Sequence, residues 1–133
     1  MSTPFSIVVL TLNEAANIGE CLHSASAVDD IFVVDSGSTD ATVAIAGAYG
    51  VRIAVNPFTS FGQQRNWAHD HLPLGHDWVL HLDADERLTP PLLEEARRAV
   101  RADDGRLAGF YIAERTLLRG RWLRRAGRQS TGR

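Results

Sequence analysis

Three carboxylates follow one apolar segment of this sequence. The segment "WVLHLDADERL" (78–88) is predicted to form a buried strand that ends at Asp83, Asp85 and Glu86. Like charges repel, and carboxylates beside a core are costly unless a cation offsets them. Residues i and i+2 of a strand share a face, so Asp83 and Asp85 lie on one side if the strand continues that far. Two hard oxygen donors suit Mg²⁺ or Mn²⁺ together with water and substrate phosphates.

A solvated turn before a helix explains the same acids without any ligand. Acids often precede a helix, where they complement its dipole, and Glu86 suits that role. The helix that follows is predicted at 89–102, with Thr89 as its N-cap and prolines in its first turn. An Asp-x-Asp triplet alone occurs often by chance. Its position at the end of an apolar strand favours the metal interpretation, and both interpretations stay open.

Another acid, Asp35, ends the strand predicted at 30–35. A carboxylate there is well placed to accept hydrogen bonds from a ribose or a base. It is also a residue type that shapes the turn that follows. Asp40 is predicted to complement the dipole of the next helix, which Ser38 or Thr39 is expected to cap. No Gly-x-Gly-x-x-Gly follows the first strand, which disfavours the common dinucleotide-binding fold.

Strands and helices are predicted to alternate along the chain. The predicted strands are 5–11, 30–35, 51–56 and 77–83, and the predicted helices are 14–25 with Asn13 as cap, 39–50, 62–72 and 89–102. A fifth strand with a hairpin is predicted within 109–125. The alternation indicates an α/β fold: a Rossmann-like, mostly parallel sheet with flanking helices. Ligands bind beyond the carboxyl ends of such strands, and three of the four strands end on polar residues, so we expect a site there.

Composition sets the class of protein. The chain has 133 residues, 44% of them hydrophobic, which is enough for one domain with a core. The first residues are predicted to form neither a signal peptide nor a membrane span, and one cysteine, Cys21, favours a reducing compartment. The sequence has no Lys, so its strongly basic residues are all Arg; residues 1–100 carry a charge of about −8 and residues 101–133 about +6. That basic segment predicts contact with phosphates or an anionic membrane surface, or else a solvated tail.

The histidines are predicted to bind no metal. His69 and His71 lie two apart on a predicted helix, so they do not face each other, and both are expected to be exposed. His81 lies inside a strand and is expected in the core or an interface. Tryptophans are predicted to anchor the core, and Trp122, among arginines, is the one suited to a membrane surface.

Four segments occur in an order and spacing that carry a resemblance. They are "SIVVLTLNEAANIGECLHSA", "IFVVDSGSTDAT", "GQQRNWA" and "WVLHLDADERL". Together they resemble the family 2 glycosyltransferases with the GT-A fold, over residues 5–125. "LDADE" with "GFYIAERTLLRGRWLRRAG" is similar to the lipopolysaccharide-core enzymes related to bacterial β-glucosyltransferases. Leu12 and Ser36 depart from the pattern, since an aromatic residue and an acid often stand there.

The resemblance implies a site for a nucleotide sugar and a metal. Asp85 matches the residue that contacts the metal, Mg²⁺ or Mn²⁺, and Asp83 matches a ligand that also lies near the ribose. Asp35 matches the acid that contacts the base, usually uracil, and Arg65 an arginine near the nucleotide. The residues implied to bind the donor are Thr11, Asn13, Glu14, Asp35, Arg65 and Asp83.

No catalytic base is predicted in this chain. An inverting sugar transfer needs a base to take the proton of the acceptor hydroxyl. In the family this base is an acid well beyond the Asp-x-Asp motif, and no acid after Glu95 stands in a matching motif. Residues 1–105 therefore resemble a nucleotide-sugar-binding domain (the donor half of the GT-A fold), and residues 106–133 the start of an incomplete acceptor-side region.

The resemblance implies a metal-dependent glycosyltransferase. It is expected to move a sugar from a nucleotide-sugar donor, UDP-linked, to a cell-envelope glycolipid or similar acceptor such as lipopolysaccharide core. The expected location is the cytoplasm, with peripheral contact to the inner face of the membrane through the Arg-rich C-terminal segment, and no nucleic-acid partner. The alternative is a noncatalytic nucleotide-sugar-binding fragment or inactive remnant. A nucleotidyltransferase is less favoured, because "TLNEAANIG" is neither basic nor Gly-rich.

Overall fold

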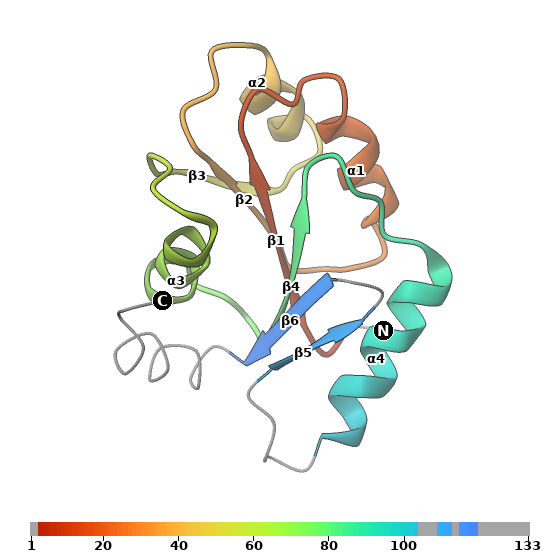
Figure 1. Ribbon diagram of the computed structural model, residues 1–133. Helices are drawn as coiled ribbons and strands as arrows, with labels where there is room; N and C mark the ends of the chain where they lie inside the picture. The colour runs from red at the N-terminus through yellow and green to blue at the C-terminus, as the bar shows by residue number, and fades with distance from the viewer. Residues whose placement is uncertain (1–2, 104–108, 113–114, 120–133) are drawn as a thin grey trace.

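The protein forms a mixed sheet flanked by helices on both faces (Figure 1). The computed structural model describes residues 3–103, 109–112 and 115–119. Within them the strands are β1 (Ser6–Thr11), β2 (Ile31–Asp35), β3 (Arg52–Val55), β4 (Trp78–Asp83), β5 (Gly109–Ile112) and β6 (Arg115–Arg119). The helices are α1 (Ile18–Ser24), α2 (Thr42–Gly47), α3 (Phe61–His71) and α4 (Pro90–Ala102). The predicted α/β architecture is confirmed.

The sheet has the strand order β3-β2-β1-β4-β6-β5. β1 to β4 run parallel, whereas β6 pairs antiparallel with both β4 and β5. The predicted hairpin is therefore present, as β5 and β6, and it continues the same sheet. The predicted boundary at residue 105 falls among residues 104–108, outside the described part, as do Trp122 and the rest of the Arg-rich segment from 120 onward.

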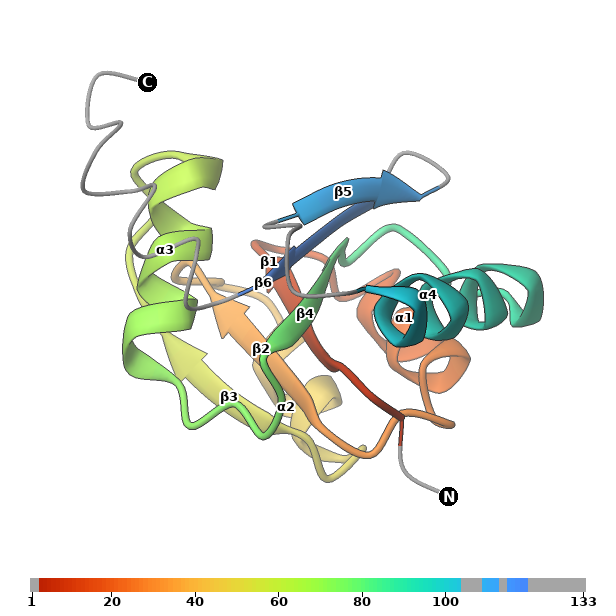
Figure 2. The same cartoon turned by 90° about the horizontal axis from the view of Figure 1, so that it is seen from below.

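Two hydrophobic layers enclose the sheet, which explains why its central strands are apolar on both faces. Alternate residues of β1, such as Val8 and Leu10, pack on the side of α3. Their neighbours Ile7 and Val9 pack on the side of α1, α2 and α4. Figure 2 shows α3 on one side of the sheet and α1 and α4 on the other.

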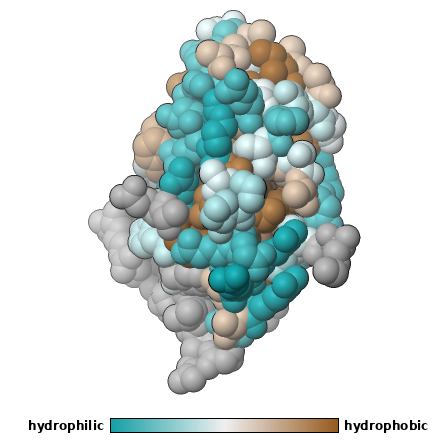
Figure 3. All heavy atoms as spheres, turned by 90° about the vertical axis from the view of Figure 1, so that its right-hand side faces the viewer, coloured by the Kyte–Doolittle hydropathy of each residue, from teal (hydrophilic) through white to brown (hydrophobic). Residues whose placement is uncertain are grey.

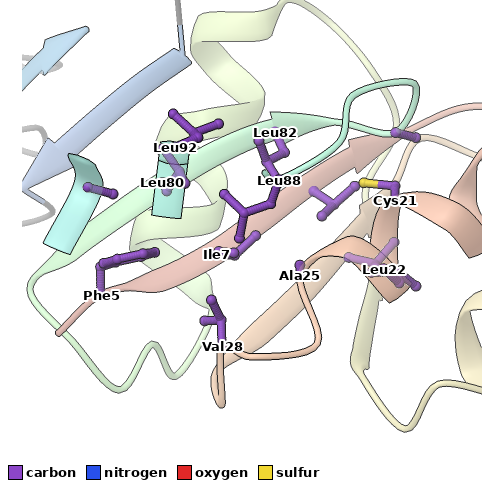
Figure 4. Packing of buried hydrophobic residues seen from close by; sticks show 14 of the residues in the cluster. Phe5, Ile7, Cys21, Leu22, Ala25, Val28, Leu80, Leu82, Leu88 and Leu92 are labelled. Atoms are coloured by element: carbon purple, nitrogen blue, oxygen red, sulfur yellow. The ribbon is translucent and has the colours of Figure 1, made fainter. Parts of the chain in front are cut away.

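The larger core lies between β4, α1 and α4. Cys21 from α1 points towards Leu82 and Leu88, which come from β4 and the segment after it (Figure 4). Burial raises the pKa of the Cys21 thiol to about 11, partly offset by the nearby positive charge of Arg87. The thiol is therefore protonated at neutral pH and behaves as a small core side chain.

Helix α4 begins as the sequence predicts. The Thr89 hydroxyl accepts a hydrogen bond from the Leu92 amide, 3.2 Å away, and prolines occupy the first helical positions. Leu92 and Ala96 are buried against the core, whereas Glu94 and Arg98 form an ion pair on the outer face. Hydrophilic residues cover much of the molecular face that carries α1 and α4 (Figure 3).

Two helices start later than predicted, because their expected caps serve the neighbouring loops. Asn13 adopts a left-handed conformation with φ of 52°, and its side-chain oxygen accepts a hydrogen bond from the Thr39 amide, 2.8 Å away. Helix α1 therefore starts at Ile18. The N-cap of α2 is Ala41 without any side-chain cap, and Ser38 instead bonds to Asp35. Both expected caps join the loops after β1 and β2 to each other.

Two buried histidines meet on the face covered by α3. His69 from α3 and His81 from β4 are 3% and 4% exposed, and their Nε2 atoms are 3.1 Å apart. The expectation for His81 is confirmed. The expectation that His69 is exposed was wrong, because α3 turns that position onto the sheet.

The buried pair makes stability depend on pH. Burial, together with the charges of His69 and Arg65, holds the pKa of His81 well below its usual value of 6.5. The unfolded chain takes up a proton near pH 6.5 while the folded chain does not, so acidification favours unfolding. We expect this one group to lower the free energy of unfolding, measured with urea, by about 1.4 kcal/mol per pH unit between about pH 6 and pH 5. His81→Gln should flatten this slope, and exposed His23→Gln should not; equal slopes in all three proteins would contradict the prediction.

Candidate active site

The predicted site residues meet at one edge of the sheet. In the parallel register Thr11 pairs with Asp35, and Leu10 pairs with Asp83, so β1, β2 and β4 end side by side. The loops that follow these strands lie together in the upper part of Figure 1. The structure therefore confirms the expected convergence of the strand ends.

A cleft of about 340 Å³ opens at this edge. We call it the strand-end cleft; its lining residues are Leu10, Thr11, Leu12, Glu14, Ser36, Phe58, Phe61, Asp83, Ala84 and Asp85. The lining has a polar part that carries carboxylates and an apolar part. The apolar part holds Leu12, Phe58 and Phe61, which are 48%, 45% and 56% exposed. The two phenylalanine rings pack edge to face, with centroids 5.1 Å apart.

The Asp-x-Asp segment is a turn rather than a strand beyond its first residue. β4 ends at Asp83, so Asp85 does not share its face through strand alternation, which corrects that expectation. The Ala84 amide instead donates to the Leu10 carbonyl, 3.2 Å away, and the Glu86 amide donates to the Asp83 carbonyl. Ala84 is buried by these contacts while Asp83 and Asp85 stay exposed in the strand-end cleft. The backbone turn, and not the alternation of side chains along a strand, therefore places both carboxylates in the cleft.

Asp83 lies where its negative charge is disfavoured. Partial burial raises the pKa of Asp83, and the charges of Glu86 and Asp85 raise it further, against the opposing effects of Arg65 and Arg115. A divalent cation would remove this repulsion. Within the described residues no group of three or more His, Cys, Asp or Glu side chains is arranged to hold a metal. Two exposed carboxylates fit Mg²⁺ or Mn²⁺, which usually bind one or two carboxylates and fill their other positions with water and substrate phosphates.

Of the residues predicted to bind the donor, Thr11 and Glu14 line the strand-end cleft, whereas Asn13 is not among its lining residues. The Thr11 side chain is 4% exposed, and its hydroxyl has no hydrogen-bond partner among the described residues. A buried hydroxyl without a partner is costly. It is therefore a group that a polar ligand in the cleft would satisfy. The Glu14 amide is fixed by the Thr42 hydroxyl, 2.9 Å away, which holds the loop after β1 against α2.

Asp35 is buried below the cleft and shapes the turn after β2. Its carboxylate accepts hydrogen bonds from the Gly37 amide, the Ser38 amide and the Ser38 hydroxyl, at 3.0, 2.8 and 2.6 Å. Gly37 has φ of 108°, a conformation that side chains disfavour. Asp35 is 1% exposed, and the next residue, Ser36, lines the cleft instead. Asp35 therefore shapes the turn after β2, which was one of its two predicted roles. Contact between Asp35 and a base stays a prediction.

Arg65 lies on α3 outside the residues that line the cleft. Its positive charge opposes the upward shift of the Asp83 pKa and adds to the downward shift of the His81 pKa. The Nε atom is buried and has no hydrogen-bond partner among the described residues. Phosphate contact by Arg65 stays a prediction.

Two parts of the site escaped the sequence interpretation. Phe58 and Phe61 were assigned no role from the sequence, although two aromatic residues in a polar segment are a signal for a ligand surface. Glu86 was expected to complement the dipole of α4. It instead contacts Asp83 and an arginine, Arg115, from a strand about thirty residues later. No local pattern in the sequence predicts that contact.

A second hollow of about 330 Å³ lies at the opposite edge of the sheet, around the start of β2 and of β3. Its buried acid, Asp30, is already satisfied. The Asp30 carboxylate accepts hydrogen bonds from Ser6 and Gly75 and lies 3.6 Å from Arg52. Since ligands of parallel sheets bind at the carboxyl ends of the strands, the strand-end cleft is the stronger candidate.

Known glycosyltransferases are similar to this chain in sequence. The chain is 33% identical to a lipopolysaccharide core biosynthesis glycosyltransferase of Rhizobium meliloti, over 88% of this chain and 44% of that protein. It is 41% identical to an uncharacterized glycosyltransferase of Rickettsia felis, over 68% of this chain and 31% of that protein. The chain thus spans less than half the length of these relatives.

Solved structures show the same fold. The glucosyl-3-phosphoglycerate synthase of Mycobacterium tuberculosis, crystallised with uridine diphosphate, superposes with a TM-score of 0.57 and 30% identity. The match covers 68% of this chain and 36% of that one. A crystal form of the same enzyme with Mn²⁺, UDP-glucose and phosphoglyceric acid matches with a TM-score of 0.53, at 29% identity, over 62% of this chain and 33% of that one.

A search of the described part of the chain finds no helix with the length and apolar character of a membrane span.

The family assignment rests on nearly the whole chain. The family model named "Glycosyl transferase family 2" matches residues 6–130, which include the strand ends and the Asp-x-Asp turn. The chain belongs to glycosyl transferase family 2.

Proposed function

We propose that the strand-end cleft binds the nucleotide part of a UDP-sugar together with a divalent cation. The observation that carries this proposal is the pairing of two exposed carboxylates, Asp83 and Asp85, with an apolar surface in one cleft. A nucleoside diphosphate has a planar base at one end and phosphates at the other, so it needs both kinds of surface. The unpartnered hydroxyl of Thr11 supplies a further polar contact.

The cation belongs at the Asp83–Asp85 turn. A bound Mg²⁺ or Mn²⁺ would hold the diphosphate and stabilise its charge as it leaves the sugar. The protein residues keep their own tasks: Asp85 and Asp83 hold the cation, and Arg65 offsets negative charge beside them. Support comes from the Mycobacterium tuberculosis synthase, which was crystallised with Mn²⁺ and UDP-glucose.

The activity proposed for the whole protein is sugar transfer to a cell-envelope acceptor. The similarity to a lipopolysaccharide core biosynthesis glycosyltransferase supports that class of acceptor. No general base is assigned, because no acid in the described residues after Glu95 lies in the strand-end cleft. The chain is therefore proposed to provide the donor-binding part of the reaction.

Calorimetry of the full chain with UDP and Mn²⁺ tests the proposal. We expect UDP to bind in the presence of Mn²⁺ and to bind more weakly when EDTA removes the metal. ADP and GDP serve as competitors that test the choice of base. Absence of any UDP binding with Mn²⁺ present would reject the proposal, and release of UDP from UDP-glucose would extend it from binding to catalysis.

The aromatic pair in the cleft gives a separate prediction. We expect Phe58→Ala to weaken UDP binding by about 10-fold, because stacking of a base on an aromatic ring contributes roughly 1–3 kcal/mol. Tyr111→Ala is the matched control: this aromatic residue is 76% exposed on β5 and is not among the cleft residues. The measurement is the UDP affinity at fixed Mn²⁺ concentration. Equal affinity of Phe58→Ala and the unmodified protein would show that the base lies elsewhere.

A further inference from the structure

Glu86 folds back over the Asp83–Asp85 turn and uses both of its carboxylate oxygens. Its Oε1 atom accepts a hydrogen bond from the Asp83 amide, 2.8 Å away. Its Oε2 atom lies 3.0 Å from Nε of Arg115, the first residue of β6. The backbone amide of Glu86 also donates to the Asp83 carbonyl, 2.9 Å away. Glu86 thus closes the turn through its backbone and through its side chain.

The ion pair with Arg115 is well suited to hold Glu86 in place. Both side chains are largely buried, with exposed fractions of 26% for Glu86 and 22% for Arg115. An exposed pair such as Glu94 and Arg98 contributes little, whereas partial burial reduces solvent screening and strengthens the attraction between Glu86 and Arg115. The pair also connects the turn to β6, which lies beside β4 in the sheet.

The arrangement separates the roles of three neighbouring acids. Asp83 and Asp85 line the strand-end cleft, and Glu86 is not among its lining residues. The charge of Glu86 is matched by Arg115 instead of being left for a ligand. Thr11 lines the same cleft, and its buried hydroxyl has no hydrogen-bond partner among the described residues, which is consistent with a polar ligand there.

We propose that Glu86, held by Arg115, is the positioning residue that keeps the Asp83–Asp85 turn in the shape that binds the divalent cation. This inference rests on the proposed function of the cleft and adds a residue pair to it. Groups that support metal ligands typically change metal affinity by 10- to 100-fold when they are removed. Glu86 acts through the backbone of Asp83 and does not itself contact the cation.

A purely electrostatic role and a positioning role of Arg115 predict opposite effects of Arg115→Gln on cation binding. If only the sum of nearby charges mattered, Arg115→Gln would strengthen cation binding, because it removes a positive charge beside the site. If Arg115 holds Glu86, the same substitution weakens cation binding, because the turn loses its support. Glu86→Gln gives a second contrast: it removes the negative charge as Glu86→Ala does, but it keeps an oxygen that can accept the Asp83 amide.

The experiment is a Mn²⁺ titration of the full chain with saturating UDP, followed by electron paramagnetic resonance of the free ion. Glu86→Ala is expected to weaken Mn²⁺ binding by about 10-fold and Arg115→Gln by a few fold. Glu86→Gln is expected to stay within about 3-fold of the unmodified protein, because it keeps the bond to the Asp83 amide. The controls are Glu94→Ala and Arg98→Gln, which break an exposed Glu–Arg pair on α4 and should change nothing.

Amide hydrogen exchange of the metal-free protein provides a readout that needs no ligand. Glu86→Ala should speed exchange at 83–86 the most, and Arg115→Gln and Glu86→Gln, which each break the ion pair but keep an acceptor for the Asp83 amide, should speed it less. Tighter Mn²⁺ binding by Arg115→Gln, equal losses in Glu86→Ala and Glu86→Gln, or unchanged exchange in Glu86→Ala would each overturn the inference. Failure of the unmodified protein to bind Mn²⁺ with UDP would instead reject the proposed function, and the exchange rates would still decide whether Glu86 and Arg115 hold the turn.

Discussion

Asp85→Ala is expected to reduce the affinity for UDP in the presence of Mn²⁺ by at least about 100-fold, or about 2.7 kcal/mol. Asp85 is exposed in the strand-end cleft, and it is the residue that we assign to direct metal contact. Without it, Asp83 is the sole carboxylate left for the cation at this turn. A site in which only two protein carboxylates bind one Mg²⁺ or Mn²⁺ depends on both of them, because water and phosphate fill the remaining coordination positions.

The matched control for this prediction is another exposed acid beside the same strand. Asp77 immediately precedes β4, at the opposite end of the strand from Asp85. Asp77→Ala changes the net charge equally but lies away from the strand-end cleft, so UDP affinity should stay unchanged. If EDTA weakened UDP binding to the unmodified protein but Asp85→Ala did not, the cation would lie elsewhere. Thermal unfolding of both variants checks that neither substitution disrupts the fold.

Asp35→Ala is expected to destabilise the protein by about 3 kcal/mol and to weaken nucleotide binding with it. The substitution removes a buried acceptor and leaves the amides of Gly37 and Ser38 and the Ser38 hydroxyl without their partner. Ser38 also accepts a hydrogen bond from the Asn13 amide, 2.8 Å away, so the loop after β1 loses an anchor as well. Both loops form part of the strand-end cleft, since Leu12 and Ser36 line it.

Urea unfolding and UDP titration together separate the two roles that Asp35 can have. Asp40 is the matched control: its carboxylate also accepts amide hydrogen bonds, from Thr42 and Ala15, but its side chain is exposed. The bonds from Thr42 lower the pKa of Asp40, and solvent replaces them at a smaller cost when Asp40 is changed to Ala. If Asp35→Asn keeps most of the stability but loses UDP affinity, Asp35 contacts the base in addition to shaping the turn. If Asp35→Ala is as stable as Asp40→Ala, the buried hydrogen bonds of Asp35 contribute less to the free energy of unfolding than expected.

The sequence by itself determined the architecture and the edge at which the site lies. Apolar strands that alternate with helices require a parallel sheet, and the polar residues at Thr11, Asp35 and Asp83 must then meet at one edge. Helix α4 and its cap, Thr89, were also predicted from local signals. These features depend on residues close together in the chain, where spacing and residue type carry the information.

Only the tertiary structure decided how the polar residues are used. Asn13 and Ser38 are good cap residues by type, yet each is taken by a neighbouring loop because the loops after β1 and β2 are in contact. Glu86 is a helix-start acid by position, yet it pairs with Arg115 because β6 lies beside β4. Side chains with several possible partners bond to whichever group the packed sheet brings within reach, and that group is distant in the sequence.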